Sequence, residues 1–173
     1  VTVLPQGTIV GPAGGIVTSA DGALVLDIPA GALASEVDVV VEALGDATFA
    51  GEAFFAGGTA YRLAPAGLEF QLQARLRIRY DPNRVPAGID PDRLRLRGRM
   101  QDGWAATGQH QHRVQTREVE GWIGGLGTFA LIGVAEGHWV GPAGATLVST
   151  DGLLELEVPA GALDGWTDVT LVA

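Results

Sequence analysis

The stretch Gly11–Ala43, GPAGGIVTSADGALVLDIPAGALASEVDVVVEA, occurs a second time at the end of the sequence. The second copy, Gly141–Ala173, reads GPAGATLVSTDGLLELEVPAGALDGWTDVTLVA and lies 130 residues downstream without a gap. The two copies are identical at 17 of 33 aligned positions, which is more than a shared β-strand composition explains. The sequence therefore contains one repeat unit and the opening part of another.

Turn signals and alternating hydrophobic residues in the repeat are typical of antiparallel β-strands. Asp21-Gly22 separates two β-like runs, which predicts a hairpin. In the strand that follows, Leu24, Leu26 and Ile28 share one face, because successive side chains of a strand point to opposite sides. Pro29 has no N–H to donate and is expected to end this strand. The first copy therefore predicts a strand with one face in a core.

The second copy keeps this pattern but lacks the later strands that follow the first. Leu154, Leu156 and Val158 are expected inside, with Glu155 and Glu157 outside. The other inward residues are Leu147, Leu163, Val169 and Leu171. Uncovered hydrophobic residues and open strand edges favour association. Two arrangements are open: the half-repeat packs on the first unit, or it completes a sandwich with strands from another molecule, with Val1–Val10 as one candidate donor.

Composition agrees with an all-β fold. The 26 Gly and 9 Pro are spread between short apolar runs. About 130 residues are enough to bury a core without disulfides, and the sequence has no cysteine. We predict an antiparallel β-sandwich over residues 1–136, with 1–10 as a linking or donated strand in one arrangement, and the first part of a second such repeat over 137–173.

Charge is divided unevenly along the sequence, whose net charge is −9. Residues 1–61 carry seven acids and no base, residues 62–117 carry all eleven bases and five acids, and residues 118–173 carry eight acids and no base. An acidic total argues against nucleic acids and anionic membranes as partners. No apolar run reaches the roughly 18 residues of a spanning helix. We therefore expect a protein partner, no nucleic acid and no membrane insertion.

Four motifs resemble those of the ZU5 domain family. They are Leu-Asp-Ile-Pro-Ala-Gly-Ala-Leu at 26–33 after a Gly-Gly pair, Tyr-Arg-Leu-Ala-Pro-Ala-Gly-Leu-Glu-Phe at 61–70, Asp-Gly-Trp at 102–104 and Thr-Phe-Ala-Leu at 128–131. The resemblance covers about residues 8–134, and the second copy begins another such unit. It implies a β-sandwich used mostly for interaction or assembly, and in some members for self-cleavage.

The segment that corresponds to the cleavage site of self-cleaving relatives is different here. Those relatives carry His-Phe-Ser near the last strands, whereas this sequence reads Ile-Gly-Gly-Leu-Gly-Thr-Phe-Ala at 123–130. Without histidine or serine, the segment lacks a nucleophile and a base within reach of each other. Thr128 is the only hydroxyl nearby, and we expect it to occupy an ordinary strand position. We therefore predict no self-cleavage. With three histidines, no cysteine and no lysine, the residues for acid–base or nucleophilic catalysis are few, and we predict no enzymatic activity and no cofactor.

Arginine alternates with hydrophobic residues in two strands of the middle segment. These arginines are Arg75, Arg77 and Arg79 in the first strand and Arg93, Arg95, Arg97 and Arg99 in the second. The alternation puts the guanidinium groups on outer faces. One interpretation is a pair of solvated faces, because exposed charges contribute little. The other is that the arginines meet carboxylates in the chain or on a neighbour, the candidates being Asp27, Asp38, Glu155 and Glu157.

Three other ligand chemistries have candidate residues. The loop oxygen donors are Asp81, Asn83, Asp90 and Asp92, whose spacing does not match the regular calcium loop. The histidines are His110, His112 and His138, and two exposed loop histidines are a simpler interpretation of the first two than a zinc or copper site. Trp104, Trp122, Trp139 and Trp166 permit stacking on sugars, although large aromatics more often fill or cover a sandwich core.

These patterns predict an exported structural or interaction module that assembles with itself or with neighbouring modules, for example as a filament or surface-layer subunit. The sequence begins with Val1, which is consistent with a removed signal peptide or with a piece of a longer protein. One alternative is a module of a long multidomain cell-surface or adhesion protein, and another is a carbohydrate-binding module. The predicted interaction residues are Leu154, Glu155, Leu156, Glu157, Val158, Val169 and Leu171 of the half-repeat, with Arg75, Arg77, Arg79, Arg93, Arg95 and Arg97.

Overall fold

A computed structural model divides the chain into two compact units, Val1–Gly133 and Val134–Ala173. The structure describes residues 7–49, 55–85, 89, 91–100, 103–113, 115–133, 137–148, 153–165 and 167–171. The regular secondary structure of these residues is β-strand, apart from three short 3-10 helices: η1 (Asp46–Phe49), η2 (Pro82–Arg84) and η3 (Pro91–Arg93). None of the helices in this described part is long and apolar enough to span a bilayer.

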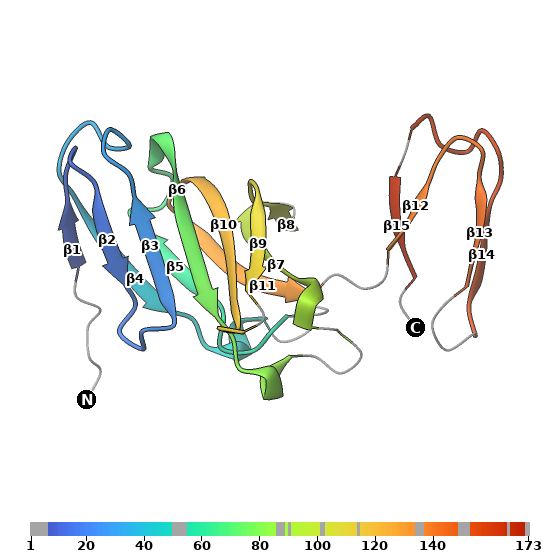
Figure 1. Cartoon of the computed structure of the whole chain (residues 1–173), viewed down its shortest axis with the longest axis horizontal. Helices are drawn as coiled ribbons and strands as arrows, with labels where there is room; N and C mark the ends of the chain where they lie inside the picture. Colours follow the sequence, from blue (N-terminus) through green and yellow to red (C-terminus); the bar gives the residue numbers. More distant parts are fainter. Residues whose placement is uncertain are drawn as a thin grey trace. The chain divides into compact units, whose positions relative to one another are not determined.

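The described strands of the first unit form two antiparallel sheets that face each other as the layers of a sandwich (Figure 1). The six-stranded sheet has the order β1 (Gly7–Val10), β4 (Val37–Ala43), β5 (Tyr61–Ala64), β11 (Thr128–Gly133), β7 (Leu94–Met100) and β8 (Gly103–Ala106). The five-stranded sheet has the order β2 (Gly15–Thr18), β3 (Leu24–Ile28), β6 (Glu69–Arg79), β10 (Glu118–Gly125) and β9 (His110–Arg113). The predicted all-β sandwich is confirmed.

Alternating side chains of the central strands fill the space between the sheets. Residues that are at most 2 % exposed include Leu24, Leu26, Ile28, Leu76 and Ile78 of the five-stranded sheet and Leu63, Leu94, Leu96 and Leu131 of the six-stranded sheet. Burial of a side chain of this size stabilises the fold by about 1.5–3 kcal/mol. The inward face predicted for β3 is confirmed, and β3 ends at Ile28, directly before Pro29.

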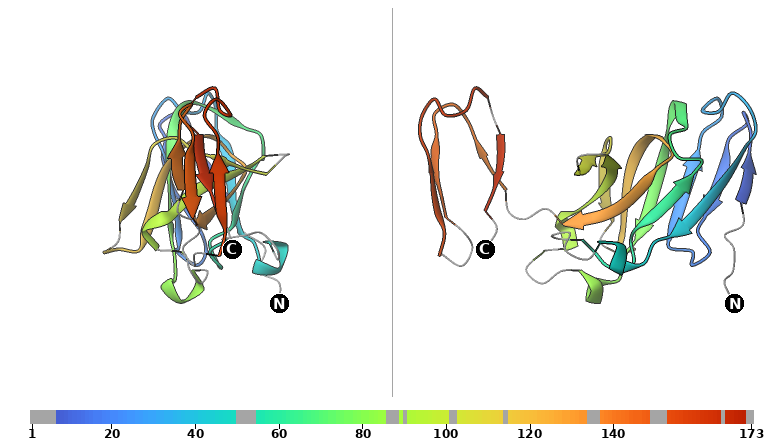
Figure 2. Two further views of the ribbon diagram at one scale, coloured as in Figure 1. Left: turned by 90° about the vertical axis from the view of Figure 1, so that its right-hand side faces the viewer. Right: turned by 180° about the vertical axis from the view of Figure 1, so that it is seen from behind.

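The second unit contains β12 (Gly137–Val140), β13 (Ala145–Val148), β14 (Glu155–Val158) and β15 (Thr167–Thr170). These strands form two two-stranded sheets, β12 with β15 and β13 with β14, which lie opposite each other (Figure 2). Their register copies the first unit with the same offset of 130: Ile16 pairs with Asp27, and Thr146 pairs with Glu157. The second unit therefore reproduces β1–β4 in structure as well as in sequence.

Glycines at positive φ hold the same turns in both copies. Gly14 has φ +77° and Gly144 has φ +76°. A Cβ on Gly14 would lie 2.4 Å from the carbonyl oxygen of Ile28, and one on Gly144 would lie 2.3 Å from that of Val158. Only glycine fits both the left-handed backbone and this close approach, so the turn fixes how the hairpin folds back in each copy.

The two copies differ in how deeply some of their corresponding side chains are buried. Val140 and Leu147 are 1 % and 4 % exposed, close to 3 % and 2 % for their counterparts Val10 and Val17. On β14, however, Leu156 is 37 % exposed, whereas its counterpart Leu26 is fully buried.

Leu154, just before β14, is 42 % exposed, and Val158 at its end is partly exposed. Leu154, Leu156 and Val158 were expected to face inward but to lack the later strands that cover their counterparts, and in this unit by itself they are not fully buried. Strands corresponding to β5, β6 and those that follow are absent from the described part of the second unit, so nothing equivalent covers these side chains.

Candidate functional site

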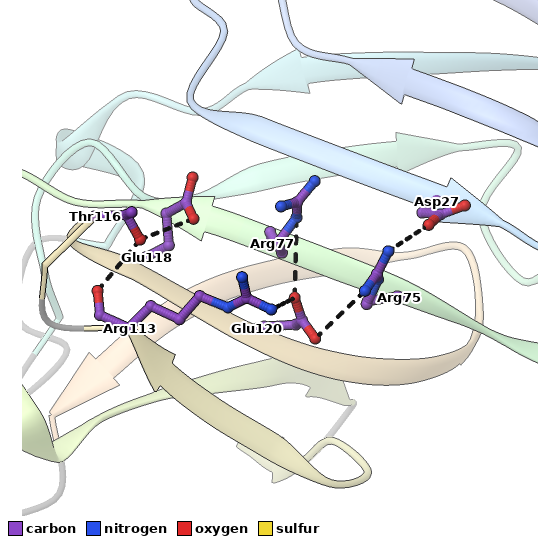
Figure 3. A network of polar contacts seen from close by, with 7 residues as sticks. All are labelled: Asp27, Arg75, Arg77, Arg113, Thr116, Glu118 and Glu120. Carbon is purple, nitrogen blue, oxygen red and sulfur yellow. Dashed lines mark hydrogen bonds and ion pairs between the residues drawn. The ribbon is translucent and has the colours of Figure 1, made fainter.

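A row of arginines follows β6 on the outer face of the five-stranded sheet. Arg75 Nη2 donates to Asp27 Oδ2 at 2.7 Å, between residues that are direct partners in the β3–β6 ladder. Arg75 Nη1 lies 3.9 Å from Glu120 Oε1 on β10. Arg75 therefore bridges carboxylates on the two strands that flank β6 (Figure 3). The pair with Asp27 is one of those that the alternation predicts.

Glu120 is the centre of this network and was missed by sequence reasoning. Its side chain is 7 % exposed, and its Oε2 lies 3.9 Å from Arg77 Nε and 3.4 Å from Arg113 Nη2. A carboxylate at this depth requires opposite charge nearby, because burying an unpaired ion is costly. The signal in the sequence was the alternation of Glu118 and Glu120, which mirrors the arginines of β6 across the ladder.

The network keeps Arg75 charged. The hydrogen bond to Asp27 and the attraction of Glu120 raise the pKa of the Arg75 guanidinium above its ordinary value. Arg79 adds a weaker contact, with its Nη2 donating to the carbonyl oxygen of Gly22 at 3.3 Å. Opposite charges on adjacent strands stabilise a sheet and fix its register, so the arginine row on β6 is bound within its own unit.

The second arginine row lies on β7, in the other sheet. Arg95 and Arg97 are partly exposed on its outer face, and Arg95 Nη1 donates to the carbonyl oxygen of Asp92 at 2.8 Å. Burial, followed by the positive charges of Arg97 and Arg93, lowers the pKa of Arg95. Because β6 and β7 belong to different sheets, the two rows do not face each other across one ladder.

The prediction that Arg93 stands on this strand is wrong. Arg93 is the last residue of η3, and β7 begins one residue later. Pro91 presets the φ of the turn that precedes the strand, and the turn extends through Arg93.

In the second unit, β14 and β15 each have one edge without a paired strand among the described residues, whereas the corresponding edges of β3 and β4 in the first unit are paired. β3 pairs with β2 on one side and with β6 on the other, whereas its counterpart β14 pairs with β13 alone among the described strands. β4 pairs with β1 and β5, whereas its counterpart β15 pairs only with β12 in the same described set. An unpaired edge presents N–H and C=O groups that are ready to bind another strand.

The remaining predicted interaction residues are placed as follows. Glu155 and Glu157 are exposed on β14, and neither forms an ion pair within the described residues. Val169 and Leu171 are partly exposed, at and just beyond β15. Asp38 lies over Gly7 of β1, where a Cβ on Gly7 would come within 2.6 Å of both carboxylate oxygens. The glycine provides the room for Asp38, so this carboxylate does not meet the arginine rows as considered.

A separate polar cluster joins the two sheets of the first unit. Tyr61 donates to Asp21 Oδ2 at 2.8 Å, and Ser19 donates to Asp21 Oδ1 at 2.5 Å. The amide of Leu24 donates to Ser19 Oγ at 2.9 Å. Asp21 therefore links the β2–β3 turn of one sheet to β5 of the other.

Two of the candidate metal ligands, His112 and Asp81, form hydrogen bonds with nearby residues. His112 lies on β9 with a side chain that is 9 % exposed, its Nδ1 3.2 Å from Asp92 Oδ1 and its Nε2 3.0 Å from the Tyr80 hydroxyl. The interpretation of an exposed loop histidine is wrong for His112. Asp81 caps η2 by accepting from the amide of Asn83 at 3.0 Å. Within the described residues there is no group of three or more metal-binding side chains; Asp90 lies outside them.

The tryptophans do not form an exposed row in the described part of the chain. Trp104 packs against Phe49, with ring centroids 5.6 Å apart, and Arg99 lies over its ring at 5.2 Å. Trp122 is partly exposed on β10, opposite Arg75. Trp166 and the side chain of Trp139 lie outside the described residues.

Residues 123–130, the segment compared above with the cleavage site of self-cleaving ZU5 domains, contain the end of β10 and the start of β11. Thr128 is the first residue of β11 and pairs with Arg62 of β5, which is the ordinary strand position expected for it. In comparisons with known proteins, the chain matches no protein-family model and no curated protein sequence. The candidate site is therefore defined by this structure: the open edges of β14 and β15, with the exposed residues beside them.

Proposed function

We propose that this protein is a structural β-module that assembles with others of its kind through the second unit. The observation that supports this proposal is a difference between the copies: among the described strands, β14 and β15 have open edges at the positions where β3 and β4 pair with β6 and β5. Open edges of this kind, next to exposed leucines, favour strand addition by another molecule.

The energetics support completion of the second unit. Leu154 and Leu156 are 42 % and 37 % exposed, so covering the exposed part would stabilise an assembly by about 0.5–1 kcal/mol for each side chain. New ladder hydrogen bonds would satisfy the edge groups of β14 and β15, each worth about 1 kcal/mol net. The sum is sufficient for association when several contacts act together.

Resemblance to ZU5 domains, which serve mostly in interaction or assembly, agrees with this proposal. We retain an extracellular or cell-surface location as part of it. A protein partner of the same β type is favoured over nucleic acid or membrane, since the chain carries a net charge of −9.

A second candidate is a module within a longer multidomain surface protein. The second unit repeats β1–β4 in the same register and with the same turns, which is the arrangement of tandem repeats. In this case a neighbouring module, rather than a separate molecule, completes the second unit.

The test compares the intact chain with residues 1–133, which have their own core. Light scattering over a range of concentrations should show association of the intact chain and a monomer for the shorter one. Hydrogen exchange gives the second measurement. A monomeric intact chain whose β14 amides exchange rapidly would favour the neighbouring module. A monomeric chain whose β14 amides are as protected as those of β3 would contradict both candidates, because the edge would already be satisfied without a partner.

A further inference from the structure

We propose that the open edge of β14 binds an antiparallel strand with arginine at alternate positions, supplied by another repeat of the kind seen in the first unit. This inference rests on the proposed function and names the chemistry of the partner strand. It is based on three observations: the register of β3 with β6, the carboxylates of β14, and the exposed leucines beside them.

The β3–β6 ladder of the first unit shows which residues pair with β3 at the edge that is open on β14. In that ladder Asp27 pairs with Arg75, and Val25 pairs with Arg77. The residues between them, Leu26 and Leu76, also pair and are fully buried. A β6-type strand therefore contributes arginines to the outer face and aliphatic side chains to the core.

The second unit presents the complementary residues at the same positions. Because the register of β13–β14 repeats that of β2–β3 with an offset of 130, Glu157 takes the place of Asp27 and Glu155 takes the place of Val25. A β6-type strand added at this edge would thus have a glutamate opposite each of two arginines. Opposite charges directly across a ladder stabilise the pairing.

Glutamate at position 155 is the distinctive feature of the second copy. In the first unit Val25 is neutral, and Arg77 obtains a carboxylate from Glu120 on the opposite side of β6, at 3.9 Å. On β14 both outward residues are acidic and exposed. The edge of β14 thus carries more negative charge toward an incoming strand than β3 does.

The apolar side of β14 matches the same partner. Leu156 is 37 % exposed at the position where Leu26 packs beside Leu76. A strand with leucine or isoleucine between its arginines would cover it. Within the described chain β6 already pairs with β3 and β10, so β6 itself is not available to β14.

The experiment uses a labelled synthetic peptide with the sequence of residues 69–80, EFQLQARLRIRY, titrated into the intact chain. Fluorescence anisotropy should show saturable binding. A control peptide of the same composition in which the three arginines are adjacent, EFQLQALIRRRY, should bind about tenfold or more weakly, because no register places all of its arginines on one face of the strand. Residues 1–133, which lack β14, should not bind either peptide.

Exchanging the charges of the chain and the peptide tests whether ion pairs between them cause the binding. The chain with Glu155→Arg and Glu157→Arg should lose about tenfold or more in affinity for the first peptide. It should gain affinity for a peptide with Arg75→Glu and Arg77→Glu, which also shows that the variant is folded. Equal binding of all peptides, or no effect of the charge reversal, would overturn the inference. If the intact chain still associates in light scattering, the proposed function stands without it; if association is also absent, both fail.

Discussion

Tyr61 and Asp21 lie 40 residues apart in the sequence, and a hydrogen bond of 2.8 Å between them connects the two sheets of the sandwich. Tyr61 is fully buried on β5, while Asp21 lies in the turn between β2 and β3. Burial, together with the neighbouring carboxylate, raises the pKa of the Tyr61 hydroxyl, so the hydroxyl remains a donor at all ordinary pH values.

Replacing Tyr61 by Phe is expected to destabilise the first unit. The variant keeps the ring but leaves one oxygen of Asp21 without this donor, and a hydrogen bond to a charged group is worth about 1.5–3 kcal/mol. Urea unfolding of residues 1–133 measures the change. In the Asp21→Asn background the same substitution should cost less, and equal costs in both backgrounds would show that the hydrogen bond is not the cause.

Acid is expected to weaken the fold partly through Asp21. Burial alone would raise the pKa of Asp21, but four hydrogen bonds outweigh it and lower the pKa below the ordinary 3.8. Their donors are the Ser19 hydroxyl, the Ala23 amide, the Tyr61 hydroxyl and the backbone amide of Asp21 itself. A carboxyl whose pKa is lower in the folded than in the unfolded state contributes stability above its unfolded pKa. This contribution is lost as the pH falls through the folded value.

Urea midpoints measured from pH 7 down to pH 2 check this effect. The wild type should lose more stability below about pH 4 than Asp21→Asn, whose side chain does not titrate. Parallel curves for the two proteins would contradict the assignment.

Glu120→Gln is expected to destabilise the first unit by about 1–3 kcal/mol, because the variant leaves neighbouring guanidinium groups without the buried charge that pairs with them. Added salt should reduce the difference by screening the arginines. Glu42→Gln is the matched control: Glu42 pairs with Arg62 at 3.3 Å, but both side chains are about half exposed. Its cost should be at most about 1 kcal/mol, and equal costs at the two sites would mean that burial is unimportant.

Gly144→Ala is expected to loosen the second unit alone. The added Cβ would lie 2.3 Å from the carbonyl oxygen of Val158 at a φ of +76°. Hydrogen exchange should show lost protection in β13 and β14, with the first unit unchanged. Gly22→Ala is the control, since Gly22 also has a positive φ but a Cβ added there would meet no atom within 4 Å beyond its chain neighbours; it should cost only about 1 kcal/mol.

Local patterns predicted the β-sandwich well. Alternation placed Leu24 and Leu26 in the core, and Asp21-Gly22 marked the hairpin, because both depend on neighbours in the sequence. The half-repeat was also visible, since identity at fixed spacing needs no structure. The same comparison predicted that Leu156 would lack cover, but the extent of its exposure depends on which strands lie beside β14.

Partners on strands far apart in the sequence were harder to predict. Glu120 meets Arg75 and Arg77 only because β10 pairs with β6, a pairing that periodicity does not contain. Likewise, His112 was expected to be solvated, and its burial comes from Tyr80, which is 32 residues away. Pairings of this kind depend on long-range topology, and a single sequence specifies strand order only weakly.

The shared register of the two copies has a kinetic consequence. β5 and β6 are formed once in the described chain, yet both β3–β4 and β14–β15 present the edges that receive such strands. During folding, the two copies therefore compete for one pair of strands. The first copy has the shorter intervening loop, which favours it, but the acidic β14 attracts the arginines of β6. Refolding of the intact chain should accordingly be slower and less uniform than refolding of residues 1–133, because some molecules must first release the wrong copy.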